Sequence, residues 1–186
     1  LPGPDAAAAG ADASAHLGGA RGQGDMDRAG GAPLGVGARA DLVGELLDTL
    51  GVAGAAAVGE GSGGGVAALL AARGRVRTLV LVGATDVDDA AAAELARREV
   101  PTLLVWGEED RLVPVEAAEA LQERIPTAAL AVLPGRGHGV AEEATPTVAT
   151  LIVEFLRSRH LGERHSHAPA GPVMLSLGRR PPGEER

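Results

Sequence analysis

Two apolar runs in the middle of the chain, residues 78–82 and 102–106, constrain the fold more than any other feature. They read TLVLV and TLLVW, and each ends directly at a glycine, Gly83 or Gly107. A strand with one face in water alternates apolar and polar residues, whereas a strand of a parallel sheet is covered on both faces and is apolar throughout. The two runs therefore predict buried strands of a parallel sheet.

Helical patterns alternate with strands along the chain. Weak strand character is expected at residues 53–58, a third buried strand at 129–133, and helices at 41–50, 66–73, 88–98, 115–124 and 147–159. This alternation predicts an α/β fold in which a parallel sheet of about four strands has helices on both faces. We expect one domain at residues 39–159, a Gly/Ala-rich loop or disordered segment at 1–38, and a disordered tail at 160–186.

The composition argues against several classes of function. The 186-residue chain is 45% hydrophobic, carries a net charge of −8 and contains no cysteine, lysine or asparagine, a bias typical of high-GC bacterial genomes. Without cysteine there is no disulfide, thiolate metal site or cysteine nucleophile. No stretch combines arginine with aromatic residues, so no nucleic-acid partner is expected. No secretory signal and no apolar run of ~18 residues is seen, which predicts a cytoplasmic protein without a membrane partner.

Three chemically capable side chains follow the ends of predicted strands. Ser62 lies in a glycine-rich turn after the first strand, Asp110 follows the third strand and His138 follows the fourth. The carboxyl ends of parallel strands meet at one rim of a sheet, where ligands bind. Ser62, Asp110 and His138 are therefore expected to converge at this rim, in the chain order of a nucleophile, an orienting acid and a general base.

The residues around these three positions resemble the α/β-hydrolase family. VGEGSGGG at residues 58–65 resembles the nucleophile elbow, PTLLVWGEEDRLVP at 101–114 resembles the strand and loop that carry the acid, and LPGRGH at 133–138 resembles the histidine loop. The likeness is strong over about residues 41–157 and weak before them.

The resemblance implies a serine hydrolase that acts on an ester-like bond of a small molecule. Ser62 would attack the carbonyl carbon, His138 would take the serine proton, and Asp110 would orient the imidazole. The backbone N–H of Gly63 would donate to the oxyanion. No cofactor and no metal is implied.

The glycine-rich turn fits the family's Gly-x-Ser-x-Gly pattern in two registers. With Ser62 at the centre, Gly64 lies two residues after it, but Glu60 lies two residues before it, where the tight turn needs a small residue. An ungapped count from Val58 instead puts Gly61 at the centre, and glycine has no nucleophile. A serine hydrolase and a catalytically silent hydrolase-like domain both remain open.

The resemblance also implies that parts of the family fold lie outside this chain. The opening LPG at residues 1–3 resembles a loop that follows an earlier strand, so the opening strands and one of two oxyanion donors are expected to be missing. The single short helix between the second and third strands leaves no room for a cap domain. The first strand would then be an exposed edge, through which we expect self-association.

A second alternative is a Rossmann-type dinucleotide-binding domain. GEGSGG at residues 59–64 matches G-x-G-x-x-G, and Asp86 follows the next strand, where a ribose-binding acid would lie. This alternative leaves the motifs at residues 101–114 and 133–138 unexplained. The histidines near the end, His160, His165 and His167, resemble a metal cluster only loosely.

Overall fold

The computed structural model describes residues 34–162 and 174–176. Contacts divide the chain into residues 1–34 and residues 35–186, and the fold described below belongs to the second unit. Residues 1–33 of the loop expected at 1–38 lie outside the described residues, as does most of the tail expected at 160–186, with His165 and His167.

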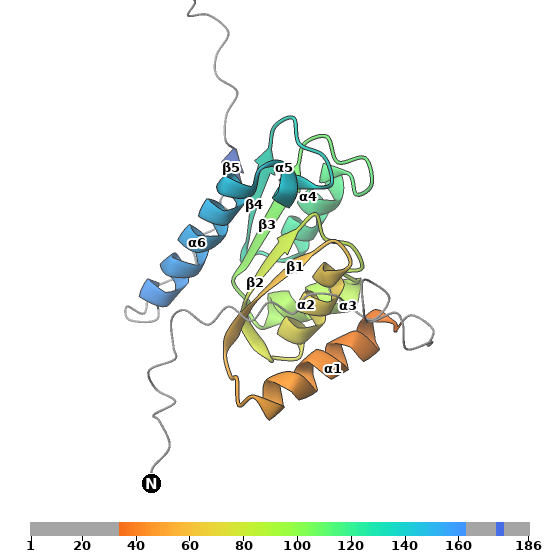
Figure 1. The fold of residues 1–186 in the computed structure, drawn as a ribbon, viewed down its shortest axis with the longest axis vertical. Coiled ribbons are helices and arrows are strands. Elements are labelled where there is room, and N and C mark those ends of the chain that lie inside the picture. The colour runs from red at the N-terminus through yellow and green to blue at the C-terminus, as the bar shows by residue number, and fades with distance from the viewer. Residues whose placement is uncertain (1–33, 163–173, 177–186) are drawn as a thin grey trace, which may run out of the picture. The chain divides into compact units, whose positions relative to one another are not determined.

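Five strands form one parallel sheet in the order β1-β2-β3-β4-β5 (Figure 1). The strands are β1 (Ala55–Glu60), β2 (Val76–Val82), β3 (Thr102–Gly107), β4 (Ala128–Leu133) and β5 (Met174–Ser176). Glu60 is the register partner of Val82 in the next strand. Gly107 is likewise the partner of Leu133. The strand ends are therefore aligned at one rim, and the predicted parallel α/β sheet is confirmed.

Helices cover both faces of this sheet (Figure 1). They are α1 (Val36–Thr49), α2 (Gly63–Ala72), α3 (Asp89–Arg97), α4 (Val115–Arg124), α5 (Val140–Glu143) and α6 (Thr145–Gly162). Successive residues of a strand point to opposite faces. Leu79 and Leu81 of β2 accordingly belong to the core shared with α1 to α4. Val80 and Val82 belong to a second core, shared with α5 and α6.

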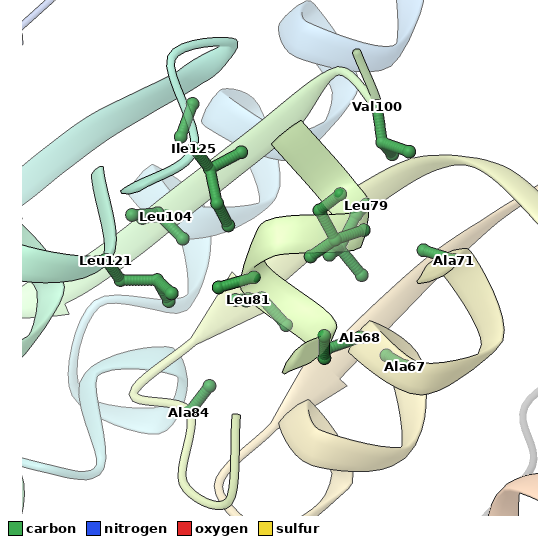
Figure 2. Packing of buried hydrophobic residues seen from close by; sticks show 14 of the residues in the cluster. Ala67, Ala68, Ala71, Leu79, Leu81, Ala84, Val100, Leu104, Leu121 and Ile125 are labelled. Carbon is green, nitrogen blue, oxygen red and sulfur yellow. The ribbon is translucent and has the colours of Figure 1, made fainter. Parts of the chain in front are cut away.

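Small residues let α2 lie close to the sheet. Ala67, Ala68 and Ala71 are buried in the same cluster as the leucines of β2, and Figure 2 shows them facing that strand. A Cβ atom on Gly64 would lie only 2.3 Å from the Cβ atom of Ala84, so no larger residue fits at the start of the helix. The many alanines and glycines thus permit a short distance between helix and sheet.

Several boundaries differ from the expectations by a few residues, for example α2, which begins at Gly63 and not at residue 66. Helix α1 begins at Val36 with Gly35 as its N-cap, not at Asp41, because the residues before Asp41 continue the helix and bury Ala40 completely. In the expected tail, α6 continues to Gly162. Residues 174–176 also add the short strand β5 beside β4. A three-residue strand is too short to show a periodic pattern in the sequence.

Strand β1 lies at the edge of the sheet. Within the described residues it pairs only with β2, and the Val58 side chain on it is 53% exposed. Among the strands that the structure describes, β1 therefore has a neighbour on one side only, as expected. Among the described helices, none is both long enough and apolar enough to cross a membrane.

Candidate active site

Asp110 and His138 meet at the rim of the sheet. Asp110 follows β3 and His138 follows β4, and the Asp110 Oδ2 atom lies 2.9 Å from the His138 Nδ1 atom. The Asp110 side chain is fully buried, whereas the His138 side chain is 34% exposed. This distance is that of a hydrogen bond, so the expected approach of these two residues is observed.

Backbone N–H groups hold the second carboxylate oxygen of Asp110. Oδ1 accepts hydrogen bonds from Leu112 at 2.9 Å and from Val113 at 2.8 Å. The indole N–H of Trp106 donates to the Val113 carbonyl oxygen at 2.9 Å, which ties the acid loop to β3. Burial raises the pKa of Asp110, but the hydrogen bonds from Val113, His138 and Leu112 outweigh it and lower the pKa below its usual value. Asp110 is therefore a fixed carboxylate that is ionised at neutral pH.

The histidine loop packs directly on the acid loop. A Cβ atom on Gly107 would lie 2.2 Å from the Gly137 carbonyl oxygen, so only glycine fits at the end of β3. The Glu109 N–H donates to the Arg136 carbonyl oxygen at 2.8 Å. On the other side, the Gly137 N–H donates to the Glu143 Oε2 atom at 3.0 Å. These contacts position the residue that follows, His138.

Glu143 contacts the backbone beside His138 and was not among the residues expected at the site. It is the last residue of the short helix α5, and its carboxylate holds the backbone beside His138. Its only signal in the sequence is that it stands in an acidic pair with Glu142 shortly after the histidine loop. Such a pair is equally typical of an exposed helix start.

Gly61 lies at the sharp turn between β1 and α2. Its φ angle of +49° is in the left-handed region. Its N–H donates to the Val82 carbonyl oxygen at 3.1 Å, and its own carbonyl oxygen accepts from Thr85 at 2.8 Å. A Cβ atom on Gly61 would lie 4.0 Å from the His138 Nε2 atom, an ordinary van der Waals distance. A side chain at position 61 would thus begin beside the imidazole nitrogen that does not face Asp110.

The residue two before Gly61 is packed as the nucleophile elbow of the family requires, whereas a Cβ atom on Gly63, two after it, would meet no atom within 4 Å. A Cβ atom on Gly59 would lie 2.6 Å from the Gly63 carbonyl oxygen, so the residue two before Gly61 has no room for a side chain. Glu60, which would occupy that place if the turn were centred on Ser62, is exposed. The crowding at Gly59 thus favours Gly61 at the centre of the turn, whereas the crowding at Gly64, two residues after Ser62, is equally compatible with Ser62 there.

Ser62 follows this turn. Its φ and ψ angles of −67° and −17° are right-handed helical, and it is the N-cap of α2 without a side-chain capping hydrogen bond. Within the described part of the chain, its hydroxyl makes no hydrogen bond to His138. Gly63 is the first residue of α2, so its N–H has no intrahelical acceptor.

Two hollows adjoin the acid loop. The larger, about 480 Å³, is lined mainly by acidic residues, with Glu108 and Asp110 among them. The smaller, about 300 Å³, lies beyond the end of β2 and is lined in part by Thr85 and Trp106. Neither lining includes His138. The partly exposed imidazole therefore stands at an open rim in contact with solvent.

A family model described as TAP-like protein matches residues 71–167, which is more than half of the chain. The matched range contains Asp110 and His138 and begins after Gly61. The comparison with this family therefore covers the acid and the histidine but not the turn.

Curated relatives match shorter segments. The uncharacterized hydrolase YugF of Bacillus subtilis is 38% identical over 64 residues, which is 34% of this chain and 23% of that protein. Monoacylglycerol lipase ABHD6 of Mus musculus is 39% identical over 62 residues, which is 33% of this chain and 18% of that protein. The chain thus spans less than a quarter of the length of these relatives.

Solved structures extend the similarity to a larger share of the chain. A meta-cleavage product hydrolase from Pseudomonas fluorescens IP01 superimposes with a TM-score of 0.66 at 22% identity, covering 74% of this chain and 77% of that chain. At this identity the likeness shows the fold. These matches favour the hydrolase interpretation over the dinucleotide-binding alternative. The family match, the fold and the acid–histidine pair agree that this chain belongs to the α/β-hydrolase family.

Proposed function

We propose that this chain hydrolyses an ester-like bond of a small molecule, with His138 as general base and Asp110 as the acid that orients it. The observation that carries the proposal is the 2.9 Å hydrogen bond between Asp110 and His138 at the strand-end rim. The names of the relatives, a hydrolase and a monoacylglycerol lipase, agree with this class of reaction.

The geometry supports the following proton path. The Nδ1–H group of His138 donates to the ionised Asp110 carboxylate, which leaves the lone pair of Nε2 free to accept a proton. When Nε2 takes that proton, the imidazolium is stabilised by the negative charge on Asp110. The same proton can then be returned to the leaving alkoxide.

The identity of the nucleophile separates two versions of this function. In the serine version, Ser62 attacks the carbonyl carbon and Gly63 donates to the oxyanion; Ser62 carries the only hydroxyl in the turn at residues 59–65. The alternative is a catalytically silent domain, in which the Gly61 register leaves no side-chain nucleophile in the turn. The left-handed φ of Gly61 and the lack of space at Gly59 support the Gly61 register.

Hydrolysis of p-nitrophenyl acetate by the full chain tests the proposal. Turnover should depend on His138 and fall by about 10²–10⁴-fold in His138→Ala, the usual contribution of a general base. The serine version further predicts that Ser62→Ala abolishes turnover and that a fluorophosphonate labels Ser62. Ser158 on α6, whose hydroxyl donates to the Phe155 carbonyl oxygen, is a matched serine control for labelling. Hydrolysis that is no faster than in His138→Ala would contradict the proposal.

We also propose that the chain self-associates through β1, with a second copy as the partner. The strand is uncharged from Ala55 to Val58, and an unpaired strand edge is a template for pairing with another strand. Size-exclusion chromatography with light scattering should show a dimer that Val58→Glu shifts toward monomer. A monomer at high concentration would contradict this.

A further inference from the structure

We infer that a water molecule, bound where a nucleophilic side chain at position 61 would stand, is the nucleophile of this site. Hydrolysis would then be a single displacement without an acyl-enzyme. The inference rests on the proposed role of His138 as general base, and it adds the identity of the attacking group. It follows from the position of Gly61 relative to the imidazole.

Beside the His138 Nε2 atom there is space for an attacking group. A Cβ atom at position 61 would have the His138 Nε2 atom as its nearest neighbour, at 4.0 Å. A hydroxyl on that Cβ atom would reach hydrogen-bond distance of Nε2, about 2.6–3.2 Å. Because the chain has glycine here, a water oxygen fits in the same place and makes the same hydrogen bond.

Packing does not require glycine at position 61. Gly59 and Gly107 have backbone atoms within 2.6 Å of where a Cβ atom would lie, so glycine is forced there. Gly61 has no such neighbour, and only its left-handed φ favours glycine. Position 61 therefore has room either for a small side chain or for a solvent molecule.

Water can reach the imidazole, and a backbone N–H is available for the negative charge that develops on the carbonyl oxygen. The His138 side chain is 34% exposed, so water reaches the rim directly. In the family geometry, the residue directly after the nucleophile position donates its backbone N–H to the oxyanion. In the Gly61 register this donor is the backbone N–H of Ser62, at the start of α2, where N–H groups have no intrahelical acceptor.

The reaction is balanced without any further reactant. The water proton passes to His138 Nε2 as the water oxygen forms a bond to the carbonyl carbon, which gives a tetrahedral oxyanion. The oxyanion collapses, the bond from carbon to the leaving oxygen breaks, and the imidazolium returns its proton to that oxygen. The products are a carboxylic acid and an alcohol, and His138 is neutral again.

Substitutions at position 61 test the inference on the full-length chain. Gly61→Ala places a methyl group where the water would bind, so turnover of p-nitrophenyl acetate should fall at least tenfold without any fluorophosphonate adduct. Gly61→Ser should gain an adduct in the peptide that contains residue 61, because its hydroxyl then lies beside Nε2. The unsubstituted chain should show no adduct and no acyl-enzyme by mass spectrometry after an acid quench. Circular dichroism checks that both variants are folded.

The outcomes separate this inference from the proposed function. An acyl or phosphonyl adduct on Ser62 in the unsubstituted chain, together with His138-dependent turnover, would overturn the inference while the proposed function stands. Gly61→Ala with full activity would also overturn it, because the water site would then be blocked without consequence. If the unsubstituted chain shows no His138-dependent hydrolysis, the proposed function and this inference both fall.

Discussion

The two halves of the rim differ in what holds them and in what they carry. At the ends of β3 and β4, hydrogen bonds and close backbone contacts fix a complete acid–histidine pair. At the end of β1, the backbone forms a tight left-handed turn, but its central residue, Gly61, carries no side chain. The difference teaches that the shape of the turn and the chemistry of its central residue are separable, because neighbouring glycines maintain the shape.

The acid half should show the largest effect on activity. Asp110→Asn replaces the carboxylate that accepts from Nδ1 by an amide that can donate to it, which favours the wrong tautomer of His138. We expect turnover of p-nitrophenyl acetate to fall by about 10⁴-fold, with circular dichroism unchanged. Glu109→Gln is the matched control, since Glu109 is exposed and contacts the histidine loop through its backbone. Equal losses in both variants would show that Asp110 has no special role.

The stability of the two halves should respond differently to one added methyl group. Gly107→Ala sets a Cβ atom against two backbone carbonyl oxygens and should lower the free energy of unfolding by about 3 kcal/mol. Gly61→Ala meets no close atom and should lower it only by about 1–2 kcal/mol, the usual cost of the left-handed conformation. Urea unfolding of both variants measures the difference, and the reverse order would contradict the described packing.

Acid should remove the contribution of Asp110 to stability. Its pKa is lower in the folded chain than in the unfolded one, so the stabilisation is complete above about pH 4, near the unfolded value. It is lost as the pH falls through the lower pKa of the folded state. The difference in unfolding free energy between the unsubstituted chain and Asp110→Asn should therefore shrink as the pH is lowered from 5 through the folded-state pKa of Asp110. A difference that grows on acidification would rule out a depressed pKa.

The smallest expected effect belongs to Glu143. Glu143→Ala removes the acceptor of the Gly137 N–H and should lower the free energy of unfolding by about 1 kcal/mol. It should also reduce turnover by a few fold, because the backbone before His138 loosens. Glu142→Ala changes the neighbouring exposed residue, whose side chain makes no hydrogen bond in the described part of the chain, and should leave both quantities unchanged. Equal values for the two variants would show that Glu143 positions nothing.

Much of the acid–histidine half could be predicted from the sequence. The run TLLVW predicts a buried strand, the glycine at its end predicts a turn, and the same holds for the strand before His138. Parallel pairing then aligns the strand ends, so Asp110 and His138 must lie near each other. Glu143 could not be found in this way, since its contact with the histidine loop is one hydrogen bond from a side chain to the Gly137 N–H, which no sequence pattern indicates.

The sequence by itself therefore determined the class of fold and the rim at which Asp110 and His138 meet, because short apolar runs and the glycines that end them act locally. Only the tertiary structure bears on the register of the glycine-rich turn, through the left-handed φ of Gly61 and the lack of space at Gly59. In the sequence alone, the glycines between Gly59 and Gly65 are compatible with either Gly61 or Ser62 at the centre of the turn. The choice depends on how closely β1 approaches α2, and that distance leaves no space for a side chain at Gly59 and leaves open space at Gly61 beside His138.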